Sequence, residues 1–388
     1  RMKLVSIYGY LEERFGTGAY KTGAWFFFIS KLLGASVRLF LICVVLQLLL
    51  FEPYGLPFWL NGAITVLLVL LYTFQGGVKS LIWTDTLKTV CLVLSIALSI
   101  WFVVQRLDMS LADMVAMVKE SDKSRIFFFD DINDRRYFFK QFLAGLFSVI
   151  AMTGLDQDMM QRSLACKNYR DSQKNLVVSS VLQTIIIFVL LVLGVILYSF
   201  AERMGINLPT GTDNMFPTVA TSPTMPIIVG VLFILGLVSS TYSAAGSALT
   251  ALTTSFTIDV LGGSKRFDDK RLTKVRKGVH IAMAVAMFVV ICTLHHVGSS
   301  NVIDAVYTLA SYTYGPILGL FAFGIFTKWK VRGRYVGIVA VVAPILCYIL
   351  QQNSERWFGG YKFSYELLIV NALITFIGLV LLIKRDNK

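Results

Sequence analysis

Residues 138–161, FFKQFLAGLFSVIAMTGLDQDMMQ, carry the features that decide the fold of this chain. Their first part is almost continuously apolar, and its length approaches the roughly 20 residues that an α-helix needs to cross about 30 Å of hydrocarbon. A glycine, two carboxylates and an amide then interrupt the run between Gly154 and Asp158. Unwound backbone within a membrane is tolerated only where it faces protein or a watery cavity. The segment therefore predicts a helical membrane bundle with an internal polar site.

The composition of the whole chain agrees with this prediction. Its 388 residues are 56 % hydrophobic and only 15 % charged, and the mean hydropathy is +0.70. Continuous apolar runs exclude a transmembrane β-barrel, whose strands alternate apolar and polar residues. We predict one all-α transmembrane domain over residues 1–388 with about ten spans, at residues 23–51, 57–76, 81–105, 138–161, 176–200, 225–260, 278–297, 302–327, 334–352 and 363–384.

The formal charge of +13 is explained by the position of the cations. If the amino terminus is cytoplasmic, most of the 36 lysines and arginines fall in segments on the inner side, including the dense run from Lys265 to Lys277. Positively charged loops are retained in the cytoplasm. The pattern predicts a multi-pass protein of the inner or plasma membrane, surrounded by lipid, with both termini of this chain cytoplasmic and no nucleic-acid partner.

Asp156 and Gln157 lie in the interrupted part of the fourth span. Ionisable groups inside a membrane are costly and usually functional, and the free amides and carbonyls of a broken helix are typical of a midplane solute site. The alternative is that the helix simply ends near Gly154 and the carboxylates sit in the cytoplasmic interface beside Arg162.

A row of hydroxyl groups lies in the sixth span. Ser240, Ser243, Ser247, Thr250 and Thr254 are separated by 3, 4, 3 and 4 residues, so they share one helical face. Small hydroxylated residues at this spacing are common packing positions between membrane helices. Their oxygens are also suitable ligands for a hard alkali cation. The spacing alone leaves both interpretations open.

A third candidate is Asp85, about one turn inside the third span, with Lys88 three residues later on a neighbouring helical position. The carboxylate either binds a second cation or a proton, or forms a structural charge pair with Lys88.

Signatures of an enzyme are missing from the sequence. The three histidines, His280, His295 and His296, form no cluster with cysteines or carboxylates that suits a metal, and no glycine-rich phosphate loop occurs. We therefore predict no catalytic residues, no cofactor and no metal other than a transported ion.

Several stretches together resemble the sodium/solute symporter family, which includes proline, sugar, iodide and sialic-acid transporters. They are YLEERFG at 10–16, Gly76-Gly77 followed by Trp83-Thr84-Asp85, Asp156-Gln157 with Gln161-Arg162, Tyr242 to Asp259, and Gly315-Pro316 to Phe326. The resemblance implies a leucine-transporter-type bundle with a five-plus-five inverted repeat. It also implies an amino-terminally truncated chain that lacks the peripheral first helix and core helices one and two.

The resemblance further implies sodium as the coupling ion. Its principal site maps to Ser240, Ser243 and Ala244, where Ala244 has no hydroxyl to offer. A second site found in some relatives maps to Asp85, Gly246 and Ser247. Because Lys88 is nearby and Gly246 has no side-chain oxygen, we predict no second sodium.

Solute contacts carried over from the family fall on Asp156 and Gln157 and on Ser311, Tyr312 and Thr313. The function implied is sodium-coupled symport of a small organic solute, such as a sugar, sialic acid, an amino acid or a carboxylate, into the cell. One alternative is a proton-coupled symporter in which Asp85 or Asp156 titrates. Another is a membrane-embedded enzyme that acts on lipid-linked substrates.

Overall fold

The computed structural model describes residues 7–75, 78–156, 159, 166, 168–208, 214–297 and 302–384. Within these residues every regular element is a helix, and the only β-type pairing is an isolated bridge between Val331 and Ile383. The prediction of an all-α protein is confirmed.

The principal helices coincide with the apolar stretches of the sequence. They are α2 (Thr17–Leu46), α3 (Phe58–Gln75), α4 (Val78–Arg106), α6 (Phe138–Val149), α8 (Tyr169–Met204), α10 (Ile227–Ser255), α12 (Asp269–Val297), α13 (Val302–Phe326), α14 (Val336–Gln352) and α16 (Leu367–Leu381). Three of them continue into π-helical turns, namely η1 (Gln47–Phe51) after α2, η4 (Ile150–Gly154) after α6 and η6 (Phe256–Val260) after α10.

Shorter elements connect these helices. The α-helical ones are α1 (Gly9–Phe15), α5 (Leu111–Glu120), α9 (Met215–Ala220), α11 (Gly263–Arg266) and α15 (Ser354–Trp357). The 3₁₀ turns are η2 (Glu52–Tyr54), η3 (Asp122–Ser124) and η7 (Gly333–Tyr335).

By length and composition, seven helical stretches suffice to cross a membrane. They are Thr17–Tyr54, Thr86–Arg106, Tyr169–Met204, Ile227–Val260, Asp269–His296, Asp304–Phe326 and Gly333–Gln352. Shorter apolar helices occupy Phe58–Phe74, Phe138–Gly154 and Leu367–Leu381. That these three also span the membrane, giving ten spans, stays a prediction.

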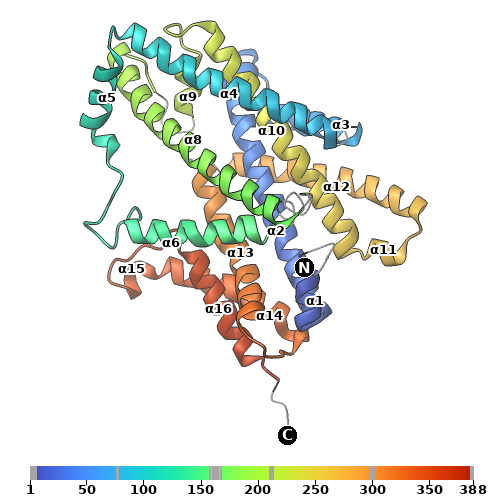
Figure 1. Ribbon diagram of the computed structural model, residues 1–388. Coiled ribbons are helices and arrows are strands. Elements are labelled where there is room, and N and C mark those ends of the chain that lie inside the picture. Colours follow the sequence, from blue (N-terminus) through green and yellow to red (C-terminus); the bar gives the residue numbers. More distant parts are fainter. Residues whose placement is uncertain are drawn as a thin grey trace.

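Helix α2 runs through the middle of the bundle and packs against α10, α12 and α13 (Figure 1). Its amino-terminal half shares one hydrophobic core with α1, α13 and α16. Its carboxyl-terminal half shares a second core with α3, α10 and α12, and a third core joins α4, α8 and α9. Side chains at different heights of α2 therefore reach different groups of helices.

Close packing between α13 and α16 depends on two glycines. A Cβ atom built on Gly319 would lie 2.6 Å from the carbonyl oxygen of Ala372 and 2.7 Å from the Cβ of Thr375. One built on Gly315 would lie 2.4 Å from the Cγ of Asn371. Lipid is as apolar as these helices, so association relies on close van der Waals contact, which small residues permit.

We expect Gly319→Ala to lower the free energy of unfolding by about 1–3 kcal/mol, because the new methyl group meets backbone that cannot move aside. Gly194→Ala in α8 is the matched control, since a Cβ there has no neighbour within 4 Å. Thermal unfolding of the purified chain in detergent measures both variants. A Gly319→Ala protein as stable as the control would contradict the close approach of α13 and α16.

Helix α1 and the segment that follows α16 both bond to residues at or just beyond the carboxyl-terminal end of α13. Arg14 of α1 donates from Nε to the carbonyl of Gly324 at 3.3 Å and also to the carbonyl of Thr327, at the carboxyl-terminal end of α13. Beside it, the backbone N–H of Lys384 donates to the carbonyl of Lys330 at 2.9 Å. A guanidinium at this position is favourable because the last carbonyls of a helix carry partial negative charge.

Candidate functional site

Helix α6 continues as η4 and ends at Gly154, and the chain then turns into the bundle. Asp156 is buried, with only 4 % of its surface exposed. The hydroxyl of Tyr8 donates to the carbonyl of Leu155 at 3.0 Å, which satisfies part of the backbone that the break leaves free. The helix thus ends where the interfacial interpretation places its end, but Asp156 lies inside the protein. Gln157, Asp158 and Arg162 lie outside the described residues.

Asp156 is the centre of a network that joins three segments of the chain. Nζ of Lys31, from α2, lies 3.1 and 3.2 Å from its two carboxylate oxygens. The hydroxyl of Tyr314, from α13, donates to Oδ2 at 3.0 Å, and the backbone N–H of Met159 donates to Oδ1 at 3.2 Å. Because a buried charge is tolerated only when it is paired and hydrogen-bonded, this network explains how the carboxylate is held in the bundle.

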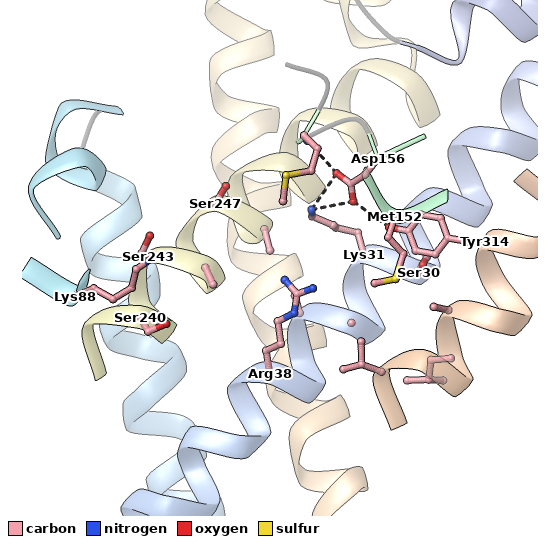
Figure 2. Close-up of a pocket in the computed structure, with 18 residues that line it drawn as sticks. Ser30, Lys31, Arg38, Lys88, Met152, Asp156, Ser240, Ser243, Ser247 and Tyr314 are labelled. Carbon is pink, nitrogen blue, oxygen red and sulfur yellow. Dashed lines mark hydrogen bonds and ion pairs between the residues drawn. The ribbon is translucent and has the colours of Figure 1, made fainter. Parts of the chain in front are cut away.

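A cavity of about 220 Å³ opens beside this network, between α2, α10 and α13 (Figure 2). The residues predicted from the sequence that line it are Asp156, Lys88, Ser240, Ser243, Ala244 and Ser247. An adjoining cavity of about 350 Å³ shares part of this wall, including Arg38, Ser240 and Ala244. The broken fourth span and the serine face of the sixth, which are far apart in the sequence, therefore border one space.

The serine face of α10 is turned toward this cavity by the small residues around it. Gly236 packs directly on Leu92 of α4, and Gly246 packs on Thr73 of α3, where an added Cβ would lie 2.8 and 2.9 Å from the nearest atoms. With these glycines against neighbouring helices, Ser240, Ser243 and Ser247 face the cavity. Their hydroxyls offer hard oxygen ligands suited to an alkali cation.

Lys88 of α4 borders the same cavity near the serine face (Figure 2). The side chain of Asp85 lies outside the described residues. The charge pair and the cation site at Asp85 therefore both stay predictions, and so does the absence of a second sodium.

The other predicted solute residues, Ser311, Tyr312 and Thr313 of α13, bond to different neighbours and do not share one site. Ser311 donates to the carbonyl of Tyr307 at 2.9 Å, and the hydroxyl of Tyr312 donates to Gln351 of α14. Neither side chain lines the two cavities described above. Thr313 donates to the hydroxyl of Ser30 at 2.9 Å, and Ser30 lines the cavity. Thr313 is therefore the one of the three that contacts its wall.

Sequence reasoning missed the residues that α2 and α13 contribute, namely Ser30, Lys31, Arg38 and Tyr314. Lys31 and Arg38 carried a usable signal, because a cation inside an apolar span is a functional candidate by default. Tyr314 carried none, since one aromatic residue in an apolar helix looks like any other. Only its contact with Asp156 distinguishes it.

A family model described as the sodium:solute symporter family matches residues 3–339, which is most of the chain. The chain belongs to this family. It is therefore a multi-pass membrane transporter that couples sodium to the movement of a small solute, and it is not an enzyme.

Individual relatives agree with this family. The chain is 23 % identical over 385 residues to the sodium/sialic acid symporter SiaT of Proteus mirabilis, covering 96 % of this chain and 75 % of that protein. It is 25 % identical over 354 residues to the sodium-coupled monocarboxylate transporter 2 of Bos taurus, covering 87 % of this chain and 56 % of that one. A solved Na⁺-coupled sialic acid symporter in a substrate-bound outward-open state matches the fold with a TM-score of 0.77 at 19 % identity, over 98 % of this chain and 77 % of that one.

The family prediction made from the sequence motifs is confirmed, and so is sodium as the coupling ion. The members of this symporter family need no cofactor for transport beyond the ion itself. The residues that bind the sodium and the solute stay a prediction. Of the predicted residues, the cavity brings Asp156 together with Ser240, Ser243 and Ser247.

Proposed function

We propose that this symporter carries a small organic solute into the cell, and that sodium and solute both bind at the cavity between α2, α10 and α13. One observation carries the proposal: the serine face of α10 and the buried Asp156 line the same space. Sodium at Ser240 and Ser243 would lie on one wall, and the solute would lie between that wall and Ser30, Thr313 and Tyr314. A bound cation and a bound solute this close influence each other's affinity, which is the requirement for coupling.

The cavity wall is formed mainly by residues of α2, α10 and α13. α2 and α13 are tied through Asp156, whereas α10 contributes hydroxyls that ion binding would order. Sodium bound to α10 would stabilise an outward-open state that accepts the solute, and rocking of the inverted-repeat halves would expose both to the cytoplasm.

The proposed direction of transport rests on the orientation of the chain. The cation-rich segments predict both termini of this chain to be cytoplasmic, in the inner or plasma membrane. The position of α1 and of Lys384 at one end of the bundle is consistent with that orientation. We further propose lipid around the bundle and no nucleic-acid partner.

The test of this function is uptake by proteoliposomes that contain the full chain. We expect an inward sodium gradient to stimulate uptake of one member of a labelled panel (N-acetylneuraminate, lactate, glucose and proline) at least tenfold over choline. Uptake that follows a pH gradient and ignores replacement of sodium by choline would contradict sodium coupling and favour the proton-coupled alternative.

In the same assay, Ser243→Ala is expected to raise the half-saturating sodium concentration about tenfold, which corresponds to about 1.4 kcal/mol. Thr250→Ala is the matched control, because Thr250 donates to the carbonyl of Gly246 in its own helix at 2.9 Å and does not border the cavity. The unmodified chain should show a Hill coefficient near one for sodium. Equal sodium dependence of the two variants would exclude the α10 site, and a coefficient clearly above one would exclude a single sodium.

A further inference from the structure

Arg38 lies well inside the apolar helix α2. It is eight residues before the end of α2 at Leu46, and the neighbouring residues 39–46 are almost all apolar. An arginine at such a depth is expensive unless it pairs or faces water, so its retention normally reflects a function. Within the described part of the chain, Arg38 forms no hydrogen bond or ion pair, and its side chain is exposed to the two adjoining cavities.

The carboxylate described beside these cavities is already bonded to other groups. Among the described side chains that line them, Asp156 is the one carboxylate, and it is bonded to Lys31, Tyr314 and the backbone of Met159. Asp85, whose side chain is not described, comes three residues before Lys88 on α4. The wall therefore presents the guanidinium of Arg38 with no described carboxylate to neutralise it.

Figure 2 shows Arg38 pointing its guanidinium toward the Lys31–Asp156 pair, with the serine face of α10 on the other side. A guanidinium is a planar fork that binds the two oxygens of a carboxylate at once, and it is less strongly hydrated than an ammonium. Beside the low-dielectric wall of a protein cavity, its attraction for an anion is stronger than in bulk water.

The rest of the wall is suited to the carbon skeleton and hydroxyl groups of an organic solute. Ala35, Ala248, Val306 and Ala310 give apolar surface, whereas Ser30 and Tyr314 give hydroxyls near the opposite end. Lys31 precedes Arg38 by two helical turns, which places the two positions about 10 Å apart along α2. This length fits a molecule that carries one acidic group at one end and polar groups at the other.

We infer that the transported solute is a small organic anion whose carboxylate binds to Arg38, with its polar end toward Ser30 and Tyr314. This assignment rests on the proposed function and names the class of its solute. The Lys31–Asp156 pair closes the far end of the site as a neutral unit.

The test compares acids with their uncharged counterparts. Purified full-length chain in detergent with sodium is titrated with lactate and lactamide, glucuronate and glucose, and N-acetylneuraminate and its methyl ester, and binding is read from the rise in unfolding temperature. We expect the acid of at least one pair to bind and its neutral counterpart not to. Arg38→Gln should weaken binding of that acid about 100-fold, and Arg38→Lys about 10-fold, because lysine keeps the charge but lacks the planar fork. Arg334→Gln, which changes an exposed arginine of η7, should leave the affinity unchanged.

Several results would overturn this inference. They are binding of a neutral counterpart as tightly as its acid, unchanged affinity in Arg38→Gln, binding of iodide in preference to every acid, or no binding by any acid. The comparison of each acid with its neutral counterpart uses the unmodified chain, so it tests the anion site even if Arg38→Gln fails to fold. Sodium-driven uptake of a neutral solute would overturn the anion site and leave sodium coupling intact. Binding of an acid through Arg38, without sodium-driven uptake, would overturn the coupling and leave the site intact.

Discussion

Lys31→Met is expected to lower the free energy of unfolding by about 3–5 kcal/mol, since it leaves a buried carboxylate without its cation. The side chains of Lys31 and Asp156 are only 11 % and 5 % exposed, and their charged atoms lie 3.1 Å apart. Asp156→Leu should cost a similar amount by leaving the ammonium unpaired. The double variant should recover most of the loss, because a buried ion pair can often be replaced by apolar residues at little cost.

Thermal unfolding of the purified chain in detergent measures this cycle of variants. Lys362→Met is the matched control, because Lys362 pairs with Glu355 at 3.3 Å where both side chains are more than half exposed. An exposed pair contributes at most about 1 kcal/mol. If the double variant is as unstable as the sum of the single ones, Lys31 and Asp156 are not coupled, and the network described here is wrong.

Asn371→Ala is expected to lower the free energy of unfolding by about 2–4 kcal/mol, because it removes two buried hydrogen bonds to carbonyls of α13, one of which has no helical donor. Pro316 has no N–H, so the carbonyl of Tyr312 loses its usual partner within the helix. Nδ2 of the fully buried Asn371 donates to that carbonyl at 3.1 Å and to the carbonyl of Ser311 at 2.9 Å. In a membrane helix, backbone freed by proline must be satisfied by a neighbouring helix in this way.

The cost of Asn371→Ala should be measured both in the unmodified chain and in a chain that carries Pro316→Ala. It restores a backbone N–H at position 316 that can donate to the carbonyl of Tyr312, so Asn371→Ala should cost less than half as much there. Asn353→Ala serves as the control, since Asn353 donates to the carbonyl of Ile349 at 2.8 Å in an exposed position. A cost of Asn371→Ala that is the same in both backgrounds would contradict a compensating role for Asn371.

These contacts show why the site was only partly predictable. The serine face of α10 and Asp156 were identified from the sequence because a hydroxyl periodicity and a charge within an apolar run are local patterns. Ser311 and Tyr312 were predicted as solute contacts by resemblance, and that role stays a prediction. Their carbonyls accept from Asn371, and neither side chain lines the cavity beside Asp156. The inward face of a helix depends on its neighbours, and a single sequence does not name them.

The break at Gly154 could be read from residues 138–161, whereas its surroundings could not. By itself the sequence determined that the chain is a helical membrane protein, because apolar length and charge position act locally on each segment. Only the tertiary structure decided that Asp156 meets Lys31, 125 residues away, and that Arg38 remains beside them without a described protein partner. Pairings at such separations follow from how whole helices pack, and packing is set by complementary shapes that no local pattern encodes.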